Sequence, residues 1–160
     1  MKKENGILVT GSSGLLGAPI VKSLLKDGYN VIGLDPIDLK EKHKNFDYFW
    51  SDNLDIKTIH LCLEKYKINK IIHAGGISGP MLFNDNPYII INNNLFLTLN
   101  LIEAVRLYKK VNRVIFCSSI SAYGELNEKN LDETHKFMPN NLYGATKASC
   151  DLILEQYYQK

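Results

Sequence analysis

The chain has 160 residues, the size of one domain with a core of its own. Hydrophobic residues make up 45% and charged residues 22%, which is typical of soluble globular proteins. The 19 basic and 17 acidic residues leave a formal net charge of +2, so the chain lacks the basic excess of a dedicated nucleic-acid binder.

Membrane, secreted and metal-binding proteins are each disfavoured by a local feature of the sequence. No run approaches the 18 consecutive apolar residues of a transmembrane helix, and the apolar run at 7–9 is too short for the core of a signal peptide. Cys62, Cys117 and Cys150 are odd in number and widely spaced, which favours neither a disulfide framework nor a zinc site. We therefore expect a cytoplasmic domain with no membrane, nucleic-acid or metal partner.

Short apolar segments alternate with longer helical patterns along the whole chain. The predicted strands cover residues 6–10, 30–34, 47–51, 70–74 and 112–118. The predicted helices cover residues 15–26, 55–66, 95–108 and 143–158. Strands that alternate with helices are typical of a parallel sheet with helices on both faces. The stretch 124–141 has no periodic pattern, and a loop of that length in a compact domain is usually functional or disordered.

A glycine-rich turn joins the first predicted strand to the first predicted helix. Residues 10–17 read TGSSGLLG, so three glycines have the spacing G-x-x-G-x-x-G. Such glycines allow a tight turn, close approach of the backbone to a pyrophosphate and close packing of the helix on the strand. The N-terminus of the helix then favours negative charge. A plain tight turn would also explain the glycines, so the interpretation depends on their context.

Asp35 provides that context, because it closes the second predicted strand at roughly the 20-residue spacing expected of an acid that binds ribose. Its carboxylate would accept hydrogen bonds from both ribose hydroxyls and would repel a 2′-phosphate. No arginine follows to reverse that preference. The sequence therefore predicts NAD as the cofactor, rather than NADP.

Tyr143 and Lys147, in the segment YGATK, lie four residues apart on one face of the last predicted helix. A nearby ammonium group favours the phenolate, so such a tyrosine can exchange a proton with an alcohol or a carbonyl. Tyr66 and Lys70 have the same spacing by chance, but they span a predicted helix end and a strand start. Ser119 follows the fifth predicted strand, where it either hydrogen-bonds a reacting oxygen or simply caps the strand.

Taken in order, these motifs resemble those of the extended short-chain dehydrogenase/reductase family, also called the NAD-dependent epimerase/dehydratase family. The resemblance runs from residue 6 to residue 147. It rests on TGSSGLLG, Asp35, Asp52, HAGG at 73–76, NNLFLTLNLIEA at 93–104, and SSISAYG at 118–124 followed by YGATK. It implies a Rossmann fold, which is a doubly wound parallel α/β sheet, with strand order 3-2-1-4-5.

The resemblance also implies residue roles. Ser119 and Tyr143 would be catalytic, with the tyrosine as acid and base, and the catalytic Lys147 would bind the nicotinamide ribose. Asp52 would contact the adenine. The full set of residues implied for the NAD site is Gly11, Ser13, Gly14, Leu15, Leu16, Gly17, Asp35, Asp52, Asn53, Ala74, Gly75, Gly76, Asn94, Cys117, Tyr143 and Lys147. No residue is assigned to a metal. For His73 and Trp50 we expect a role in the core.

Members of the resembled family are usually much longer, and their second half supplies a sixth strand and most of the substrate pocket. The resemblance therefore implies that residues 1–160 form one NAD-binding domain, the amino-terminal part of a longer enzyme without its carboxy-terminal substrate domain. Leu97 stands where the family usually has glycine, and HAGG replaces the usual HxAA. We expect both changes to affect packing rather than chemistry.

Ile120 and Ser121 follow Ser119, at the two positions where the 4,6-dehydratases of the resembled family carry an Asp-Glu pair. This difference disfavours dehydration as the reaction. Water elimination needs that extra acid and base. Reversible hydride transfer at a secondary alcohol remains, and we expect a nucleotide-sugar epimerase or reductase. A dehydrogenase of a small hydroxy compound is the alternative within the class. A non-catalytic NAD-binding module, or a fragment without activity, is the alternative outside it.

Helix 95–108 is apolar on all sides, so most of its surface must be covered. In the resembled family this helix and the one at 143–158 meet their symmetry mates. The resemblance therefore implies a homodimer through these two helices. A further part of the chain that covers them within one subunit is the alternative.

Overall fold

Five parallel strands form one sheet in the computed structural model, which describes residues 5–51, 55–79, 82, 85–125, 132 and 134–158. The strands are β1 (Gly6–Thr10), β2 (Asn30–Asp35), β3 (Phe46–Trp50), β4 (Ile68–His73) and β5 (Arg113–Phe116). Their order is β3-β2-β1-β4-β5, and each neighbouring pair is parallel. This confirms the predicted order 3-2-1-4-5. The central strand β1 is a continuous apolar run because both of its faces are covered.

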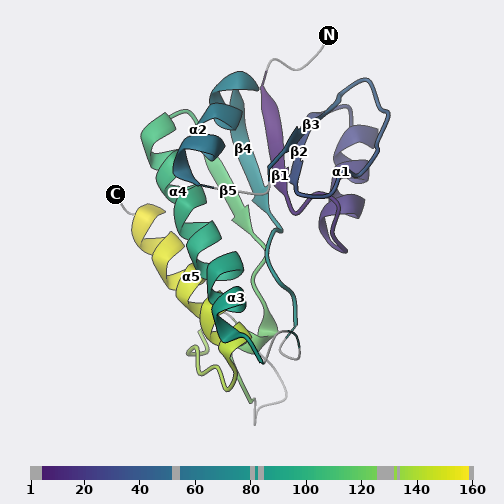
Figure 1. Ribbon diagram of the computed structural model, residues 1–160. Coiled ribbons are helices and arrows are strands. Elements are labelled where there is room, and N and C mark those ends of the chain that lie inside the picture. The colour runs from purple at the N-terminus through teal and green to yellow at the C-terminus, as the bar shows by residue number, and fades with distance from the viewer. Residues whose placement is uncertain are drawn as a thin grey trace. The chain divides into compact units, whose positions relative to one another are not determined.

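The described contacts divide the chain into two units, of which the first holds the sheet. It comprises Met1–Gly75 and Asn100–Cys117. Helix α1 (Gly17–Lys26) packs on one face through Val21 and Leu25. Helix α2 (Ile56–Lys65) and the later turns of α4 (Leu97–Tyr108) pack on the other face, and Figure 1 shows α1 and α2 on opposite sides of the strands. The sheet is therefore doubly wound, as predicted.

The predicted bounds of these elements are close to the observed ones, with one informative difference. The first predicted helix begins at residue 15, whereas α1 begins at Gly17. Leu15 and Leu16 belong to the glycine-rich turn, and the side chain of Leu15 is 90% exposed. The apolar pattern that extended the prediction therefore comes from two leucines outside the core.

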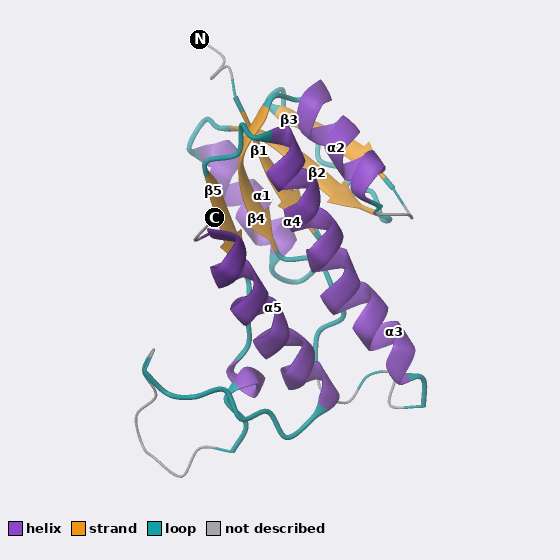
Figure 2. Ribbon diagram, turned by 90° about the vertical axis from the view of Figure 1, so that its left-hand side faces the viewer, coloured by secondary structure: helices purple, strands orange, loops and turns teal. Residues whose placement is uncertain are grey.

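The second unit comprises Gly76–Leu99 and Ser118–Lys160. Helix α5 (Leu142–Tyr158) packs against α3 (Pro87–Ile91), the π-helical turn η1 (Asn92–Phe96) and the short 3₁₀ turn η2 (Ile120–Ala122). Figure 2 shows α5 following a long loop, and the described part of 124–141 contains no helix or strand.

The helical residues 87–94 were not predicted, because the predicted helix begins only at residue 95. Three successive asparagines at 92–94 disfavour a helix, and only the proline at the first helical position signals a start.

The continuous helical stretch Pro87–Tyr108 is 22 residues long with a mean hydropathy of 1.2, so its length and composition would suit a membrane span. Polar residues interrupt this stretch, so it contains no long run of consecutive apolar residues. A core helix of a soluble protein has the same properties. Leu101, Ala104 and Tyr108 are buried in the core of the first unit, so the packing of α4 accounts for its apolar character there.

Candidate functional site

The glycine-rich turn of the first unit is folded tightly back on itself. The Gly14 N–H donates to the Gly11 carbonyl oxygen at 3.0 Å, and the Ala18 N–H donates to the Gly14 carbonyl oxygen at 3.0 Å. Gly11 has φ +66°, and a Cβ there would lie 2.7 Å from the carbonyl oxygen of Ala74. A Cβ on Gly17 would overlap the Gly11 carbonyl oxygen. The backbone conformation at Gly11 and the lack of space at Gly17 therefore both require glycine.

The N-terminus of α1 opens from this turn without a side-chain cap. Leu16 occupies the cap position, no side chain accepts a hydrogen bond there, and the first turn has no acidic residue. The first N–H groups of a helix lack intrahelical partners and carry partial positive charge, so such an end favours an anion. The turn and the helix end together can hold a phosphate group.

Asp35 lies beside the glycine-rich turn, as the ribose-binding prediction requires. Its Oδ2 accepts a hydrogen bond from the Ser13 N–H at 3.1 Å, and its Oδ1 accepts one from the Ile37 N–H at 2.9 Å. The residue is 7% exposed. An ionised carboxylate accepts about four hydrogen bonds, so both oxygens retain capacity for hydroxyl groups.

Two aromatic residues of β3 contact the same segment, and the sequence did not indicate these contacts. The Tyr48 hydroxyl donates to the Asp35 carbonyl oxygen. The Trp50 indole N–H donates to the Pro36 carbonyl oxygen at 3.0 Å. Burial, with the charges of Asp35 and Asp38, raises the pKa of Tyr48, so its phenol stays a neutral donor at physiological pH. For Trp50 the expected core role is wrong, because its side chain is 58% exposed.

The end of β4 is joined to β1 and β5 through polar groups. The Thr10 hydroxyl lies 2.5 Å from His73 Nδ1, and it accepts a hydrogen bond from the Gly75 N–H at 3.2 Å. His73 is buried and stacks on Phe116 with ring centroids 5.6 Å apart, which confirms its expected core role. The Cys117 N–H donates to the His73 carbonyl oxygen at 3.0 Å. Ala74, Gly75 and Cys117 therefore lie at the carboxyl ends of neighbouring strands, as expected.

In the second unit, Asn94 holds a turn together. Its Oδ1 accepts a hydrogen bond from the Ile77 N–H at 2.8 Å, and its Nδ2 donates to the Ile77 carbonyl oxygen at 3.1 Å and to the Thr146 hydroxyl at 3.2 Å. Gly76 has φ +128°, and a Cβ there would lie 2.7 Å from Asn94 Oδ1. The buried amide of Asn94 therefore fixes the Gly76 turn and one point on α5.

Tyr143 and Lys147 lie together on α5, and both side chains are buried. The Lys147 ammonium is 6.0 Å from the centroid of the Tyr143 ring. Ser119 precedes the turn η2, where its hydroxyl accepts a hydrogen bond from the Ser121 N–H at 3.2 Å. A Cβ on Gly144 would overlap the Ser121 carbonyl oxygen, so the glycine in YGATK allows α5 to approach the segment that carries Ser119.

The chance pair behaves as predicted. Tyr66 ends α2 and Lys70 lies within β4, so the two residues share no helix face.

A hollow of about 510 Å³ in the second unit includes Ser119 in its wall. The other lining residues are Ser118, Ile120, Tyr123, Phe137, Asp151 and Glu155. The Ser118 hydroxyl donates to Asp151 Oδ2. Burial raises the pKa of the Asp151 carboxyl, while the hydrogen bond from Ser118 and the charge of Lys147 oppose that shift. Asp151 was not predicted as a site residue, although it follows Lys147 by one helical turn.

The predicted site residues thus fall into two groups, apart from two that lie outside the described residues. Asp52 and Asn53 are those two. The first unit contains Gly11, Ser13, Gly14, Leu15, Leu16, Gly17, Asp35, Ala74, Gly75 and Cys117. The second unit contains Gly76, Asn94, Ser119, Tyr143 and Lys147.

Several known proteins are similar to this chain in sequence and in fold. The chain is 27% identical over 164 residues to the UDP-glucuronate 4-epimerase of Thermodesulfobacterium geofontis, covering 94% of this chain and 50% of that protein. It is 29% identical over 160 residues to the UDP-glucose 4-epimerase of Rhizobium meliloti, covering 97% and 48%. The crystal structure of the Thermus thermophilus UDP-glucose 4-epimerase in complex with NAD matches with a TM-score of 0.85 at 29% identity, covering 96% and 51%.

The chain therefore spans about half the length of the relatives that it matches. A model of the NAD dependent epimerase/dehydratase family matches residues 7–160, which is nearly all of the chain. This match agrees with the ordered motifs and with the doubly wound sheet. The chain belongs to the NAD-dependent epimerase/dehydratase family.

Proposed function

We propose that residues 1–160 form the NAD-binding domain of an enzyme that transfers hydride at a secondary alcohol of a nucleotide sugar. The observation that carries this proposal is Asp35, whose buried carboxylate is fixed beside the glycine-rich turn by the Ser13 and Ile37 N–H groups. The relatives named above are UDP-sugar 4-epimerases, and they supply the substrate class.

The residues of the first unit fit NAD. Gly11 and Gly17 leave no space for a side chain in the turn, and the uncapped end of α1 favours the pyrophosphate. Asp35 would accept hydrogen bonds from the adenosine ribose hydroxyls, and its charge would oppose a 2′-phosphate. When bound, NAD would accept and return a hydride.

Residues of α5 would accept and return the proton of the reaction. Tyr143 would take the proton from the substrate hydroxyl as the alcohol becomes a carbonyl, and would return it in the reverse step. Lys147 would stabilise the phenolate through its positive charge and bind the nicotinamide ribose. Ser119 would hold the reacting oxygen by a hydrogen bond. The 510 Å³ hollow beside Ser119 falls in the size range of small-molecule sites.

A 4-epimerase or a reductase is favoured over a dehydratase, because Ile120 and Ser121 supply neither the acid nor the base that water elimination needs. A dehydrogenase of a small hydroxy compound would use the same three residues. A non-catalytic NAD-binding module would not need the three catalytic residues, but the intact Ser119, Tyr143 and Lys147 favour an enzyme. In the full-length relatives the second half of the chain would complete the substrate site.

A cytoplasmic homodimer is part of the same proposal. Within the second unit, exposed apolar residues occur on η1 and on α5, and they include Phe96, Leu152 and Tyr158. A two-fold interface would bury such a self-complementary surface. Light scattering at micromolar concentration should give the mass of two chains, and a monomer that stays in solution would contradict the dimer.

The proposed function is tested by calorimetry with NAD, followed by incubation with NAD and UDP-sugars and separation of the products by chromatography. We expect NAD to bind and the 4-epimers to interconvert, or a keto sugar to be reduced. If NAD does not bind, the proposal is wrong. Release of a dehydrated sugar would overturn the assignment of the reaction.

A further inference from the structure

The segment that carries Asp35 is held by an unusual set of contacts. We call residues 35–37 the acid loop. Each of its three successive carbonyl oxygens accepts a hydrogen bond from a side chain outside the loop. The pairs are Tyr48 hydroxyl to Asp35, Trp50 indole to Pro36 and Ser13 hydroxyl to Ile37.

The two aromatic donors come from one face of β3. Tyr48 and Trp50 are two residues apart on that strand, so their side chains leave the sheet on the same side. On β2, Tyr48 pairs with Gly33 and Trp50 pairs with Asp35. The Tyr48 hydroxyl thus reaches along β2, to the carbonyl oxygen of the residue two positions beyond its own partner Gly33.

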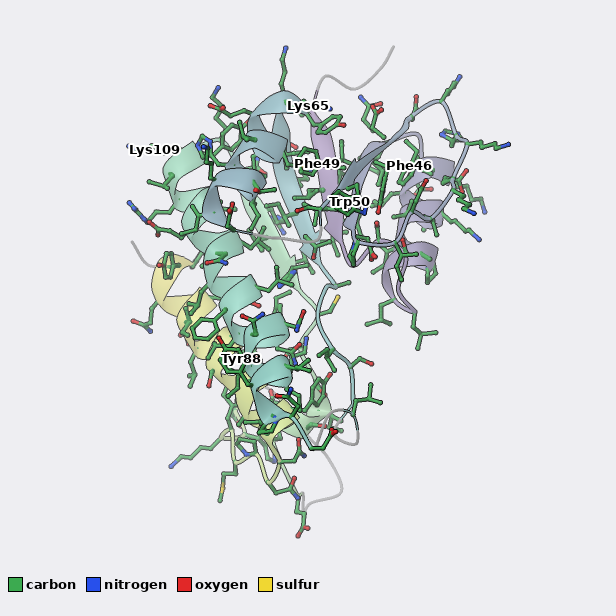
Figure 3. The ribbon with its side chains drawn as sticks, in the orientation of Figure 1. Phe46, Phe49, Trp50, Lys65, Tyr88 and Lys109 are labelled. Carbon is green, nitrogen blue, oxygen red and sulfur yellow. The ribbon has the colours of Figure 1, made fainter. Side chains whose placement is uncertain are left out.

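Burial in the core does not explain the tryptophan at position 50. Its side chain is 58% exposed, and it lies at the end of β3 in Figure 3. An indole has a single polar hydrogen, and Trp50 uses it on the Pro36 carbonyl oxygen at 3.0 Å. Pro36 has no N–H of its own, so the loop has few backbone bonds with which to fix itself.

The loop in turn fixes the Asp35 carboxylate. One oxygen accepts from the Ile37 N–H within the loop, and the other accepts from the Ser13 N–H of the glycine-rich turn. A shift of the loop would move the Ile37 donor and release the carboxylate to rotate. A fixed carboxylate loses less conformational freedom when a ligand binds, and it opposes a second negative charge from a constant position.

From this arrangement we infer that Tyr48 and Trp50 are positioning residues that hold the acid loop, and so set both the affinity for NAD and its preference over NADP. The inference rests on the proposed NAD site. Neither residue would touch the ribose, because each acts through the loop backbone on Asp35.

The test uses Tyr48→Phe and Trp50→Phe, with Tyr88→Phe as the matched control. Tyr88 is 65% exposed on α3, and none of the described hydrogen bonds to the acid loop comes from it. The Kd values for NAD and NADP are measured by calorimetry on the 160-residue chain. We expect each test variant to weaken NAD binding by roughly threefold to tenfold, the effect of one lost hydrogen bond, and to change NADP binding less.

A second readout needs no cofactor. Hydrogen exchange of the Ile37 amide should be several-fold faster in both test variants than in the wild type and in Tyr88→Phe, because that amide is protected only while the loop holds Asp35 in place.

The outcomes separate the two proposals. If the wild type binds NAD and both test variants keep its affinity and its preference over NADP, the inference is overturned and the proposed function stands. Equal weakening of NAD and NADP, with unchanged exchange at Ile37, would show a purely structural role and would also overturn it. Failure of the wild type to bind NAD would overturn both.

Discussion

Gly144 lies so close to the carbonyl oxygen of Ser121 that a methyl group has no room between them. This contact brings the start of α5, with Tyr143, against the 3₁₀ turn that follows Ser119. Both atoms at the contact are backbone, so neither can rotate away as a side chain would. The packing of two proposed catalytic residues therefore depends on the glycine within YGATK.

We expect Gly144→Ala to lower the free energy of unfolding by about 1–3 kcal/mol, the usual cost of overpacking. It should also reduce activity, because α5 must move away from the turn that carries Ser119. Urea denaturation measures the first effect. Gln156→Ala, at an exposed position of the same helix, should have almost no effect. Wild-type stability in Gly144→Ala would show that the turn moves freely.

Asn94 provides a second test within the same unit. Asn94→Ala would leave the partly buried backbone groups of Ile77 and the buried Thr146 hydroxyl without their amide partner, which should cost about 1–3 kcal/mol of stability. Asn93→Ala is the matched control. The Asn93 side chain is exposed, and its Nδ2 donates a hydrogen bond to the Ile89 carbonyl oxygen. Equal losses in the two variants would argue against the anchoring role of Asn94.

Features set by neighbouring residues could be predicted from the sequence, whereas contacts between residues far apart in the chain could not. Continuous apolar runs and the glycine spacing are local signals, and they placed β1, the glycine-rich turn and Asp35 correctly. The acid loop contacts of Tyr48 and Trp50 join residues more than ten positions apart. Alternation along β3 puts both residues on one face, but no local pattern states which carbonyl oxygen they reach.

The second unit shows the same limit. Pro87 and the asparagines at 92–94 gave a weak helix signal, because the helix there is stabilised by the buried amide of Asn94 rather than by propensity. Asp151 was missed for a related reason. Partial burial raises the pKa of its carboxyl, and its hydrogen-bond donor, the Ser118 hydroxyl, is 33 positions away, so neither can be seen from its place on the helix.

Asp151 should make stability depend on pH. Burial raises the pKa of its carboxyl in the folded state, so the protonated form is favoured there, and stability is lost as the pH rises through that raised value. Asp151→Asn keeps an acceptor for Ser118 and removes the charge. We expect it to raise the Tm at about pH 7 and to have little effect at about pH 4. Glu155 lies one turn further on at an exposed position, so Glu155→Gln should leave the Tm unchanged at both pH values.

Tyr143→Phe should strongly slow hydride transfer and leave NAD binding unchanged, because it removes the hydroxyl that moves the proton and keeps the buried ring. General acid–base groups contribute roughly 10²–10⁴-fold to rates, and we expect a loss of that size in kcat with UDP-sugars. Tyr66→Phe is the control, since its partner at the same spacing, Lys70, lies on a strand. A loss under about tenfold would contradict the assigned role.

The cofactor preference is tested most directly at Asp35. Asp35→Asn removes the negative charge and converts one of the two acceptor oxygens into a donor, which would face the N–H of Ser13 or Ile37. Hydrogen bonds to charged groups are the stronger ones, so we expect NAD affinity to fall about tenfold or more. NADP binding should improve relative to NAD, because the repulsion of the 2′-phosphate is gone. Asp38→Asn serves as the control. Asp38 lies three residues further on, and its Oδ1 accepts a hydrogen bond from the Lys40 N–H at 2.8 Å. Calorimetry with both cofactors measures the effect, and a wild-type chain that binds NADP more tightly than NAD would refute the role of Asp35.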